Sequence, residues 1–555
     1  MEKDGVRIDH STLQKCTASQ AAFNVFFYMF GATQVPYAMG QMGWTYGPIA
    51  LATLSIGSWI SGHLLVDICV RKKLHTWPLV AEEAFGSNGY ILMQILQTVS
   101  FMLTGIVQVQ GSGSLWQQAF PNSSLCQWQW IIINIIPYAI FLQIPSFSGD
   151  FLMKAATAIT LVLTAWRLSI MTYYLSAFGS YCNVCYNHQT PTSIMSAAAN
   201  LVFSYGSHAV MPEEVREMRT DTDMFRSWNW ANAVALPIYA VVGMWGFWAF
   251  GVFNSGANMI LNFKDGPAVR AYLISSAMLG YLPLTYGQIL LFLKVELRLG
   301  VSPSDYLRHS NPERCAYDWI KSVPPALFRF VFRLSVLSSY ALVAEAFLGF
   351  GLQNMVSLVG AISVTALTFY LPFVLHFKLF EWDMWNKDAM EDSDNVNNSY
   401  SSLPLASEEK ANKNHEESGT EIFGDEISEN RMESGALSTL STAKGRCILS
   451  CLNGGGNGRR FVRIIGYILG ATLGIFLCGA GVYFTIKNIM EQENGTGLFD
   501  GACFENSFFI GSDRRQPGQG GYSCGGEDDP DSFYNTFYVP TCVEGKIQCS
   551  QYGAC

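Results

Sequence analysis

Two short stretches of the sequence decide the fold: FGATQVPY, from Phe30 to Tyr37, and FSYGSHAVMP, from Phe203 to Pro212. Each lies in an apolar segment and places a glycine five or six residues before a proline. Glycine adopts non-helical backbone angles at little cost. Proline removes a backbone donor, clashes with the preceding turn and suits the first turn of a new helix. The pattern therefore predicts two helices that are each interrupted by a short unwound segment.

An unwound backbone inside a membrane is tolerated only where it faces protein or a water-filled cavity. We therefore expect both interruptions to line a cavity. The N–H groups at the start of each second half-helix suit a carboxylate, because the helix dipole is positive there. The freed carbonyl groups suit a cation or an ammonium group. A pair of kinks that serve packing alone is the alternative interpretation.

Apolar segments recur along the chain, and each is long enough to cross a hydrocarbon core of roughly 30 Å. Eleven helices are predicted, over residues 17–40, 48–70, 90–111, 130–146, 155–178, 193–217, 229–253, 268–297, 326–348, 352–377 and 462–488. The two interruptions fall in the first and the sixth, which begin corresponding sets of five helices. Interrupted helices at matching positions of two halves indicate a secondary-transporter site. The expected fold class is an all-α membrane protein with a 5+5 inverted-repeat core, discontinuous helices 1 and 6, and an eleventh helix.

Composition agrees with a polytopic membrane protein. Half of the 555 residues are hydrophobic and only 14% are charged, against about 25% in soluble domains. The formal net charge of −9 comes from residues 381–433, which hold 15 acidic and 4 basic residues, so the remainder carries about +2. This distribution excludes an ordinary cytosolic enzyme, a disordered regulator and a nucleic-acid binder, which would need a basic face.

Basic residues predict the orientation. Lys and Arg follow the second and sixth segments, separate the eighth from the ninth and precede the eleventh, whereas loops 112–129 and 179–192 contain none. Because cytosolic loops carry the excess of Lys and Arg, the N-terminus is expected in the cytosol and the C-terminus outside it. The plasma membrane and an endomembrane both fit.

The chain is expected to divide into five regions. These are a cytosolic N-terminus (1–16) without a cleaved signal peptide, a core (17–377), an acidic Ser/Asn-rich cytosolic loop that is expected to be disordered (378–460), helix 11 (461–488) and a Cys-rich outer tail (489–555). Five of the 14 cysteines lie in the tail, where disulfides are permitted. Glycosylation sequons begin at Asn122 and Asn494. A zinc site at Cys182 and Cys185 is a weaker alternative, because no second ligand pair is evident; we expect no metal and no cofactor.

The interrupted helices and their flanking motifs resemble the amino acid/auxin permease family of the amino acid–polyamine–organocation superfamily, which carries an amino acid transporter transmembrane domain. The similar stretches are Val35-Pro36-Tyr37-Ala38 with Gly43-Trp44, Phe203 to Val210 with Pro212-Glu213, Gly57-Ser58-Trp59, Ile144-Pro145-Ser146-Phe147 and Thr164-Ala165-Trp166. The resemblance implies the fold of the bacterial leucine transporter and import of amino acids. It also implies coupling to H⁺ or, in some branches, to Na⁺.

Carried onto this sequence, the resemblance implies a substrate site at the two interruptions. Gly31, Ala32, Thr33 and Gln34 would offer backbone N–H groups to the substrate carboxylate. Ser204, Tyr205, Gly206 and Ser207 would hold the amino group and begin the side-chain pocket. Ordinary packing is the alternative for each of these side chains.

Two ionisable residues are candidates for ion coupling. His208 sits at the second interruption, and histidine titrates near pH 6.5, which suits proton handling; a neutral histidine bonded to a carbonyl is the alternative. Arg167 lies in the middle of the fifth segment, and an intramembrane charge is a functional hypothesis by default. Because arginine keeps its proton, we expect a fixed cation at the place where a Na⁺-coupled relative binds Na⁺. A structural partner for an acid or for helix carbonyls is the alternative.

Other polar and aromatic residues have structural interpretations. Asp67 and Arg71 are spaced for an i,i+4 ion pair near the inner end of the second segment. Trp44, Trp128 and Trp228 are expected to be anchors at the membrane interface.

The leading functional hypothesis is H⁺-coupled import of amino acids by alternating access, with the substrate, H⁺ and the lipid bilayer as partners. An auxin-like or indole-acid carrier and a nutrient sensor on a transporter fold are alternatives. An intramembrane acyltransferase using His208 is disfavoured, because general acid–base chemistry wants a partner within reach and no acidic one is evident.

Overall fold

A computed structural model describes residues 16–29, 34–120, 123, 125–143, 150–178, 190–250, 266–299, 324–348, 351–382 and 457–493, and four two-residue strands beyond them. The chain forms two compact units. Unit 1 comprises Met1–His376 and Gly470–Cys555, and unit 2 comprises Phe377–Leu469. Gly31, Ala32 and Thr33, which are predicted substrate contacts, lie outside the described residues, as does most of the acidic loop.

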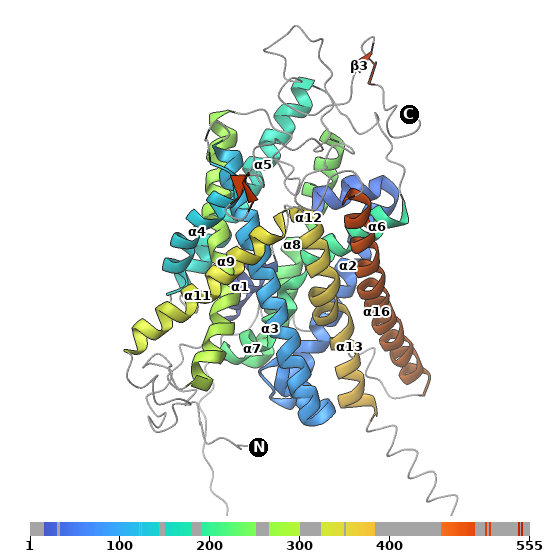
Figure 1. The fold of residues 1–555 in the computed structure, drawn as a ribbon. Helices are drawn as coiled ribbons and strands as arrows, with labels where there is room; N and C mark the ends of the chain where they lie inside the picture. Colours follow the sequence, from blue (N-terminus) through green and yellow to red (C-terminus); the bar gives the residue numbers. More distant parts are fainter. Residues whose placement is uncertain are drawn as a thin grey trace, which may run out of the picture. The chain divides into compact units, whose positions relative to one another are not determined.

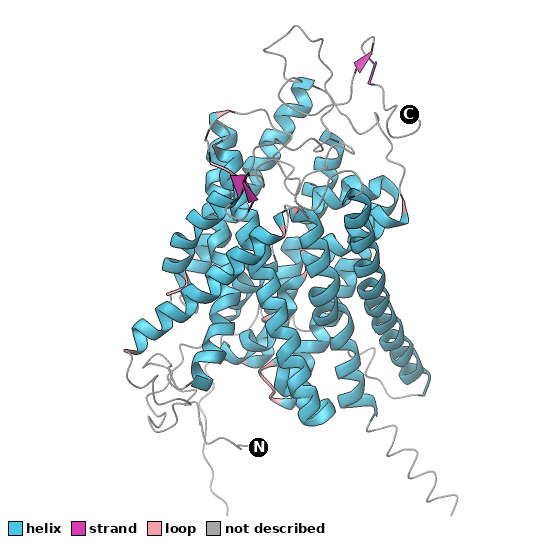
Figure 2. Ribbon diagram, in the orientation of Figure 1, coloured by secondary structure: helices cyan, strands magenta, loops and turns pink. Residues whose placement is uncertain are grey.

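Helices make up most of the described part of the chain up to residue 493, as Figures 1 and 2 show. They are α1 (Ala18–Met29), α2 (Val35–Lys72), α3 (Trp77–Ala119), α4 (Gln127–Phe141), α5 (Asp150–Phe178), α6 (Pro191–Phe203), η1 (Gly206–Ala209), α7 (Met211–Glu217), η2 (Asp221–Asp223), α8 (Met224–Phe250), α9 (Pro267–Leu299), α11 (Pro325–Ala346), α12 (Leu352–Val359), η7 (Gly360–Val364), η8 (Ala366–Tyr370), α13 (Leu371–His376), η9 (Phe377–Trp382) and α16 (Asn457–Glu493). Two antiparallel pairs, β1 (Asn506–Ser507) with β2 (Ile510–Gly511) and β3 (Cys542–Val543) with β4 (Lys546–Ile547), are the strands in the described tail. The predicted helical fold class is thereby confirmed for the described residues.

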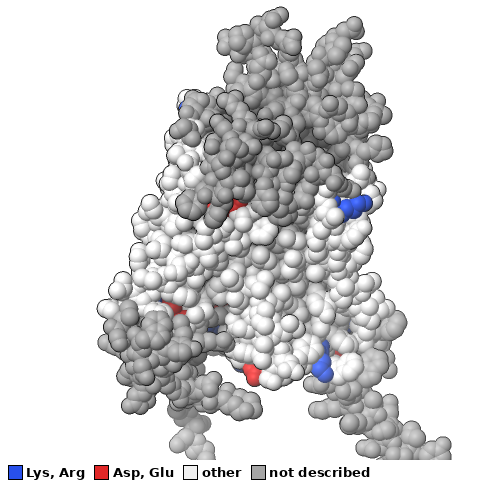
Figure 3. Space-filling view, in the orientation of Figure 1, with Lys and Arg blue, Asp and Glu red and all other residues white. Residues whose placement is uncertain are grey.

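Seven helical stretches among the described residues are long and apolar enough to cross a membrane. Their outer surfaces carry large apolar side chains, among them Leu92, Val162 and Leu469, each more than 60% exposed. Figure 3 shows a face on which the described surface is almost free of charged side chains. Exposed apolar surface of this extent suits contact with lipid. The chain is therefore a multi-pass membrane protein.

Glycines mark the bends inside two long helices. α2 changes direction at Gly43 (φ 66°), and α3 does so at Gly86 (φ 70°). A positive φ is strained for residues with a Cβ atom, so glycine suits both bends. The first part of α2, Val35–Met42, is thus the second half of the first interrupted helix.

The helices of unit 1 pack around a common interior. α1 and α2 both pack on α8, α3 packs on α9, and α6 packs on α12. A buried apolar cluster joins α3, α4, α9, α11 and α12 through residues such as Val109, Tyr138 and Tyr340. Gly360, at the start of η7, lies so close to α6 that a Cβ atom there would be 2.1 Å from the Ala199 carbonyl oxygen. The tenth predicted segment is therefore pressed against the first half of the sixth.

Unit 2 joins η9 to the first part of α16. Arg463 Nη1 lies 3.0 Å from Glu381 Oε1, and the rings of Phe377 and Tyr467 are 5.8 Å apart. A largely buried ion pair and a ring contact thus hold the two ends of the acidic segment together.

Candidate functional site

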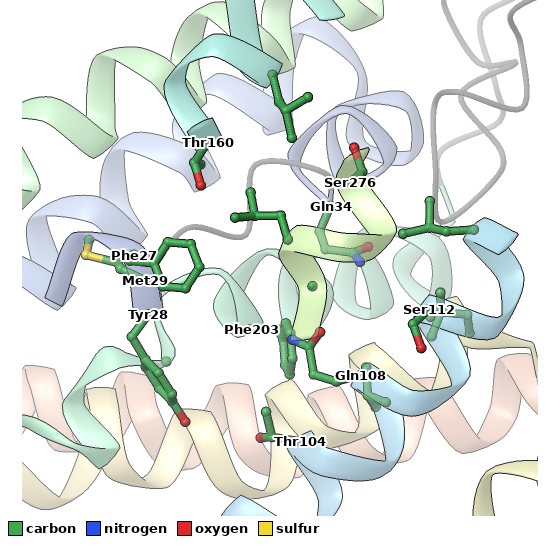
Figure 4. Close-up of a pocket in the computed structure, with 18 of the residues that line it drawn as sticks. Phe27, Tyr28, Met29, Gln34, Thr104, Gln108, Ser112, Thr160, Phe203 and Ser276 are labelled. Atoms are coloured by element: carbon green, nitrogen blue, oxygen red, sulfur yellow. The ribbon is translucent and has the colours of Figure 1, made fainter. Parts of the chain in front are cut away.

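A cavity of about 220 Å³ lies inside unit 1, between α1, α3, α5, the α6–η1 region, α9 and the α12–η7 region. Figure 4 shows side chains from separate helices converging on this space. Its uncharged polar lining consists of Tyr28, Gln34, Ser100, Thr104, Gln108, Ser112, Thr160, Thr164, Tyr272 and Ser276. Arg167 is the one charged residue among the described lining residues. The rest of the wall is apolar, which is usual for a site that binds a small molecule.

The first interruption opens onto this cavity. α1 ends at Met29 and α2 begins at Val35, and Phe27, Met29 and Gln34 all line the space. Gln34 is 9% exposed, and its Oε1 accepts no hydrogen bond from the described residues. A buried amide oxygen without a donor suits a ligand that brings one. Gly31, Ala32 and Thr33, the other predicted carboxylate contacts, lie outside the described residues.

The second interruption is a 3₁₀ turn rather than an open unwound segment. α6 ends at Phe203, η1 covers Gly206–Ala209, and α7 starts at Met211. Phe203, Gly206 and Ala209 line the cavity. The predicted contacts Ser204, Tyr205 and Ser207 are buried but are not among the lining residues.

Protein donors already hold the carbonyl groups that this interruption frees. Tyr239 Oη donates to Ser204 O at 2.8 Å, Trp77 Nε1 to His208 O at 2.8 Å, and Gln97 Nε2 to Ala209 O at 2.9 Å. The turn is therefore held in place from α3 and α8.

Tyr239 links the two interruptions. Its hydroxyl group also lies within hydrogen-bond distance of Met29 O at the end of α1, so its single proton is shared between the carboxyl ends of both first half-helices. The Tyr239 ring is fully buried and packs edge-on against Tyr205, whose own hydroxyl lies 2.6 Å from Ser55 Oγ. Little in the sequence indicated this role. The one signal was that a buried tyrosine hydroxyl generally needs a hydrogen-bond partner.

His208 is turned away from the cavity. Its Nε2 lies 3.0 Å from Ser61 Oγ and 3.2 Å from Ser58 O, and its Nδ1 lies 3.3 Å from Tyr205 O. The ring is fully buried and packs edge-on against Trp228, 5.0 Å away. In this arrangement His208 ties η1 to α2, and its proposed proton role stays a prediction.

Arg167 lies in the cavity wall. Its side chain is 5% exposed, and its Nε donates to Tyr272 Oη of α9 at 2.8 Å. The guanidinium carbon is 5.5 Å from the Tyr272 ring centroid. A fixed positive charge therefore faces the space that a ligand would occupy.

Comparison with known proteins identifies the family. Residues 14–403 match the model of the family described as transmembrane amino acid transporter protein. The chain belongs to this family. Two relatives from Arabidopsis thaliana are similar: amino acid transporter AVT1E, 25% identical over 265 residues (43% of this chain and 47% of the relative), and AVT1I, 21% identical over 246 residues (40% and 56%). The chain thus spans about half the length of these curated relatives.

Among solved structures, a mutant manganese transporter of Eremococcus coleocola is similar with a TM-score of 0.40 and 12% identity, over 88% of this chain and 97% of that chain. The match of residues 14–403 to the family model confirms the resemblance of the sequence to the amino acid/auxin permeases at the level of the family.

Several features of this chain escaped the sequence analysis. Glu296 and Arg333 form a buried two-point ion pair between α9 and α11, with Nε–Oε1 at 2.7 Å and Nη2–Oε2 at 2.9 Å. Glu213 and Glu214 are buried in α7. The signal for each was a charge inside an apolar segment.

Near the carboxyl end of α2, the predicted Asp67–Arg71 pair is confirmed, with Oδ1 and Nε 2.8 Å apart. Asp67 Oδ2 also lies 3.0 Å from Nε2 of His376 on α13, a contact that sequence spacing does not show. The expectation that Trp228 is an interface anchor was wrong. Trp228 is fully buried, and its Nε1 donates to Trp59 O at 3.0 Å. The Trp228 ring packs on Gly62, where a Cβ atom would lie only 2.3 Å from the ring.

Proposed function

We propose that this chain is a secondary active transporter that moves amino acids across a membrane by alternating access. The observation that carries the proposal is the cavity bounded by both helix interruptions and lined by uncharged polar groups and one guanidinium. Interrupted helices around a site near the middle of the bundle are typical of secondary transporters. Membership of the family and its description support an amino acid as substrate.

The substrate carboxylate is proposed to bind at Gly31, Ala32, Thr33 and Gln34, where the backbone passes from α1 into α2. N–H groups ahead of a helix favour an anion. The amino group is proposed to lie toward Ser204, Tyr205, Gly206 and Ser207, where the end of α6 frees backbone carbonyl groups. Gly206 in the cavity wall supports this second contact.

Coupling to H⁺ rather than Na⁺ is proposed from the charge in the cavity wall. Arg167 would occupy the place of a coupling cation permanently, because guanidinium keeps its proton. Import then uses the energy of a proton gradient. The sequence makes His208 the first candidate for the group that binds the proton. An auxin-like or indole-acid carrier and a nutrient sensor are the alternatives, and we expect no enzymatic activity.

The membrane arrangement is part of the proposal. Eleven transmembrane helices would form two inverted sets of five plus helix 11, with the N-terminus in the cytosol. Loop 378–460 would lie in the cytosol, and the tail 489–555, with its disulfides and its sequon at Asn494, would lie outside, in the plasma membrane or an endomembrane. The charge distribution along the sequence supports this orientation.

Uptake of a labelled amino-acid mixture into proteoliposomes tests the proposal, with and without an inward proton gradient and with and without Na⁺. Accumulation that needs the proton gradient and ignores Na⁺ is expected. Dependence on Na⁺ would keep amino-acid transport and overturn the ion assignment. Binding of a substrate without flux, measured by a shift in thermal unfolding, would favour the sensor.

A further inference from the structure

Two adjacent buried carboxyl groups on α7 are linked through Gln97 to a residue that lines the cavity. Glu213 and Glu214 of α7 are each 2% exposed. Glu213 Oε1 accepts a hydrogen bond from Gln97 Nε2 at 3.0 Å, and the same Gln97 nitrogen donates to the carbonyl of Ala209, which lines the cavity. Ionised carboxylates inside a membrane bundle are costly and mark ion pathways. The pair is therefore a candidate site for a coupling ion.

Asn24 of α1 supplies the second observation. Its Nδ2 donates to Glu214 Oε2 at 3.3 Å, and the side chain is 1% exposed. Its Oδ1 has no hydrogen-bond partner among the described residues. A carboxylate has only acceptors, so it leaves this oxygen unmatched. A protonated Glu214 has an O–H donor to offer it, and the amide and the acid then form two hydrogen bonds.

Other charged and titratable groups surround the two carboxyl groups. Glu213, Glu217 and Arg216 on the same helix act electrostatically on Glu214, and Arg216 Nη2 lies 3.7 Å from Glu217 Oε1. From α1 and α2, the titratable groups that Glu213 influences are Tyr28 and Cys69. From α3 the contact is the uncharged Gln97. Two neighbouring carboxyl groups in one buried site disfavour double ionisation, so one of them holds a proton.

We propose that Glu214 is the proton-binding group of the transport cycle and that Asn24 is its hydrogen-bond partner. This inference rests on the proposed H⁺-coupled transport and moves the proton from His208 to α7. A proton that enters through the cavity binds a carboxylate oxygen of Glu214, and the new O–H donates to Asn24 Oδ1. Release breaks that O–H bond and returns the carboxylate. Glu213 keeps its hydrogen bond from Gln97. Protonation thus strengthens the contact between α1 and α7, which flank the two interruptions.

Full-length wild-type protein and Glu214→Gln, reconstituted in proteoliposomes, test the site. Glutamine keeps the shape and supplies N–H donors in place of the acid proton. We expect Glu214→Gln to lose gradient-driven accumulation, so that uptake with the gradient equals uptake without it, while exchange of internal for external substrate continues. Glu83→Gln makes the same charge change at a carboxyl group whose side chain is 47% exposed and should behave as wild type. Gradient-driven accumulation by Glu214→Gln at the wild-type level would overturn the proposal.

Asn24→Ala provides the second arm if Glu214→Gln does not fold. Alanine removes both the Nδ2 donor and the Oδ1 acceptor, so the pH profile of uptake should change, and an unchanged profile would count against the site. Thermal unfolding in detergent separates this proposal from the proposed function. Even if the wild type transports no amino acid, its unfolding temperature should fall with rising pH. This fall should be steeper than the fall measured for Glu214→Gln. Parallel pH curves for the two proteins would dismiss the proton site whatever the substrate.

Discussion

The guanidinium group of Arg167 on α5 meets the hydroxyl of Tyr272 on α9 in the wall of the cavity, with Nε and Oη 2.8 Å apart. A hydrogen bond to a charged donor is stronger than one between neutral groups, so this contact fixes the position of the charge. The charge can therefore act on an ion or on a substrate in the cavity. Two predictions follow from these two possibilities.

Removal of the charge should change the ion dependence of transport. Arg167→Ala is expected to retain uptake and to gain stimulation by Na⁺, because the position of the fixed cation becomes available. Uptake into proteoliposomes with Na⁺ or with choline outside measures the effect. Arg167→Lys keeps the charge and should stay indifferent to Na⁺. A well-folded Arg167→Ala with unchanged ion dependence would refute the fixed-cation role.

The same charge should select against cationic substrates. Arg167 is the one charged side chain in the described part of the cavity wall, so a positively charged substrate side chain meets repulsion without a carboxylate to offset it. Free lysine and arginine should inhibit uptake of a labelled neutral amino acid about tenfold more weakly than unlabelled neutral amino acids do. A tenfold difference in affinity corresponds to about 1.4 kcal/mol. Competition assays give the ratio. Equal inhibition by cationic and neutral amino acids would contradict the prediction.

Tyr239 should stabilise both interruptions at once. Tyr239→Phe removes the hydroxyl that bridges Met29 O and Ser204 O and leaves buried carbonyl groups with fewer donors. A loss of about 1–3 kcal/mol of folding free energy is expected, together with slower transport. Thermal unfolding in detergent and initial uptake rates measure the two effects. Tyr483→Phe, at a ring that is 62% exposed, is the matched control and should change neither.

The sequence predicted the helical class and the place of both interruptions, because glycine, proline and apolar length act locally. It did not predict that the second interruption is a 3₁₀ turn whose carbonyl groups are held by Trp77, Gln97 and Tyr239. These donors come from α3 and α8, and such contacts depend on how helices pack. Periodicity also cannot show which charges meet, as with Glu296 and Arg333. His208 was singled out by its position, but packing turns its ring toward α2.

The contact between α6 and η7 should tolerate no side chain at Gly360. A Cβ atom there would lie 2.1 Å from the Ala199 carbonyl oxygen, a backbone atom that cannot rotate away. Gly360→Ala is therefore expected to push the tenth segment from the sixth and to cost about 1–3 kcal/mol of folding free energy. Gly479→Ala, at a helical glycine of α16 with open space around its Cβ position, is the control and should be neutral or slightly stabilising. Thermal unfolding of both variants in the same detergent compares them. If Gly360→Ala unfolds at the wild-type temperature and transports normally, the two segments separate more freely than their close approach implies. The seam between them would then be a place where the bundle moves during alternating access, rather than a fixed contact.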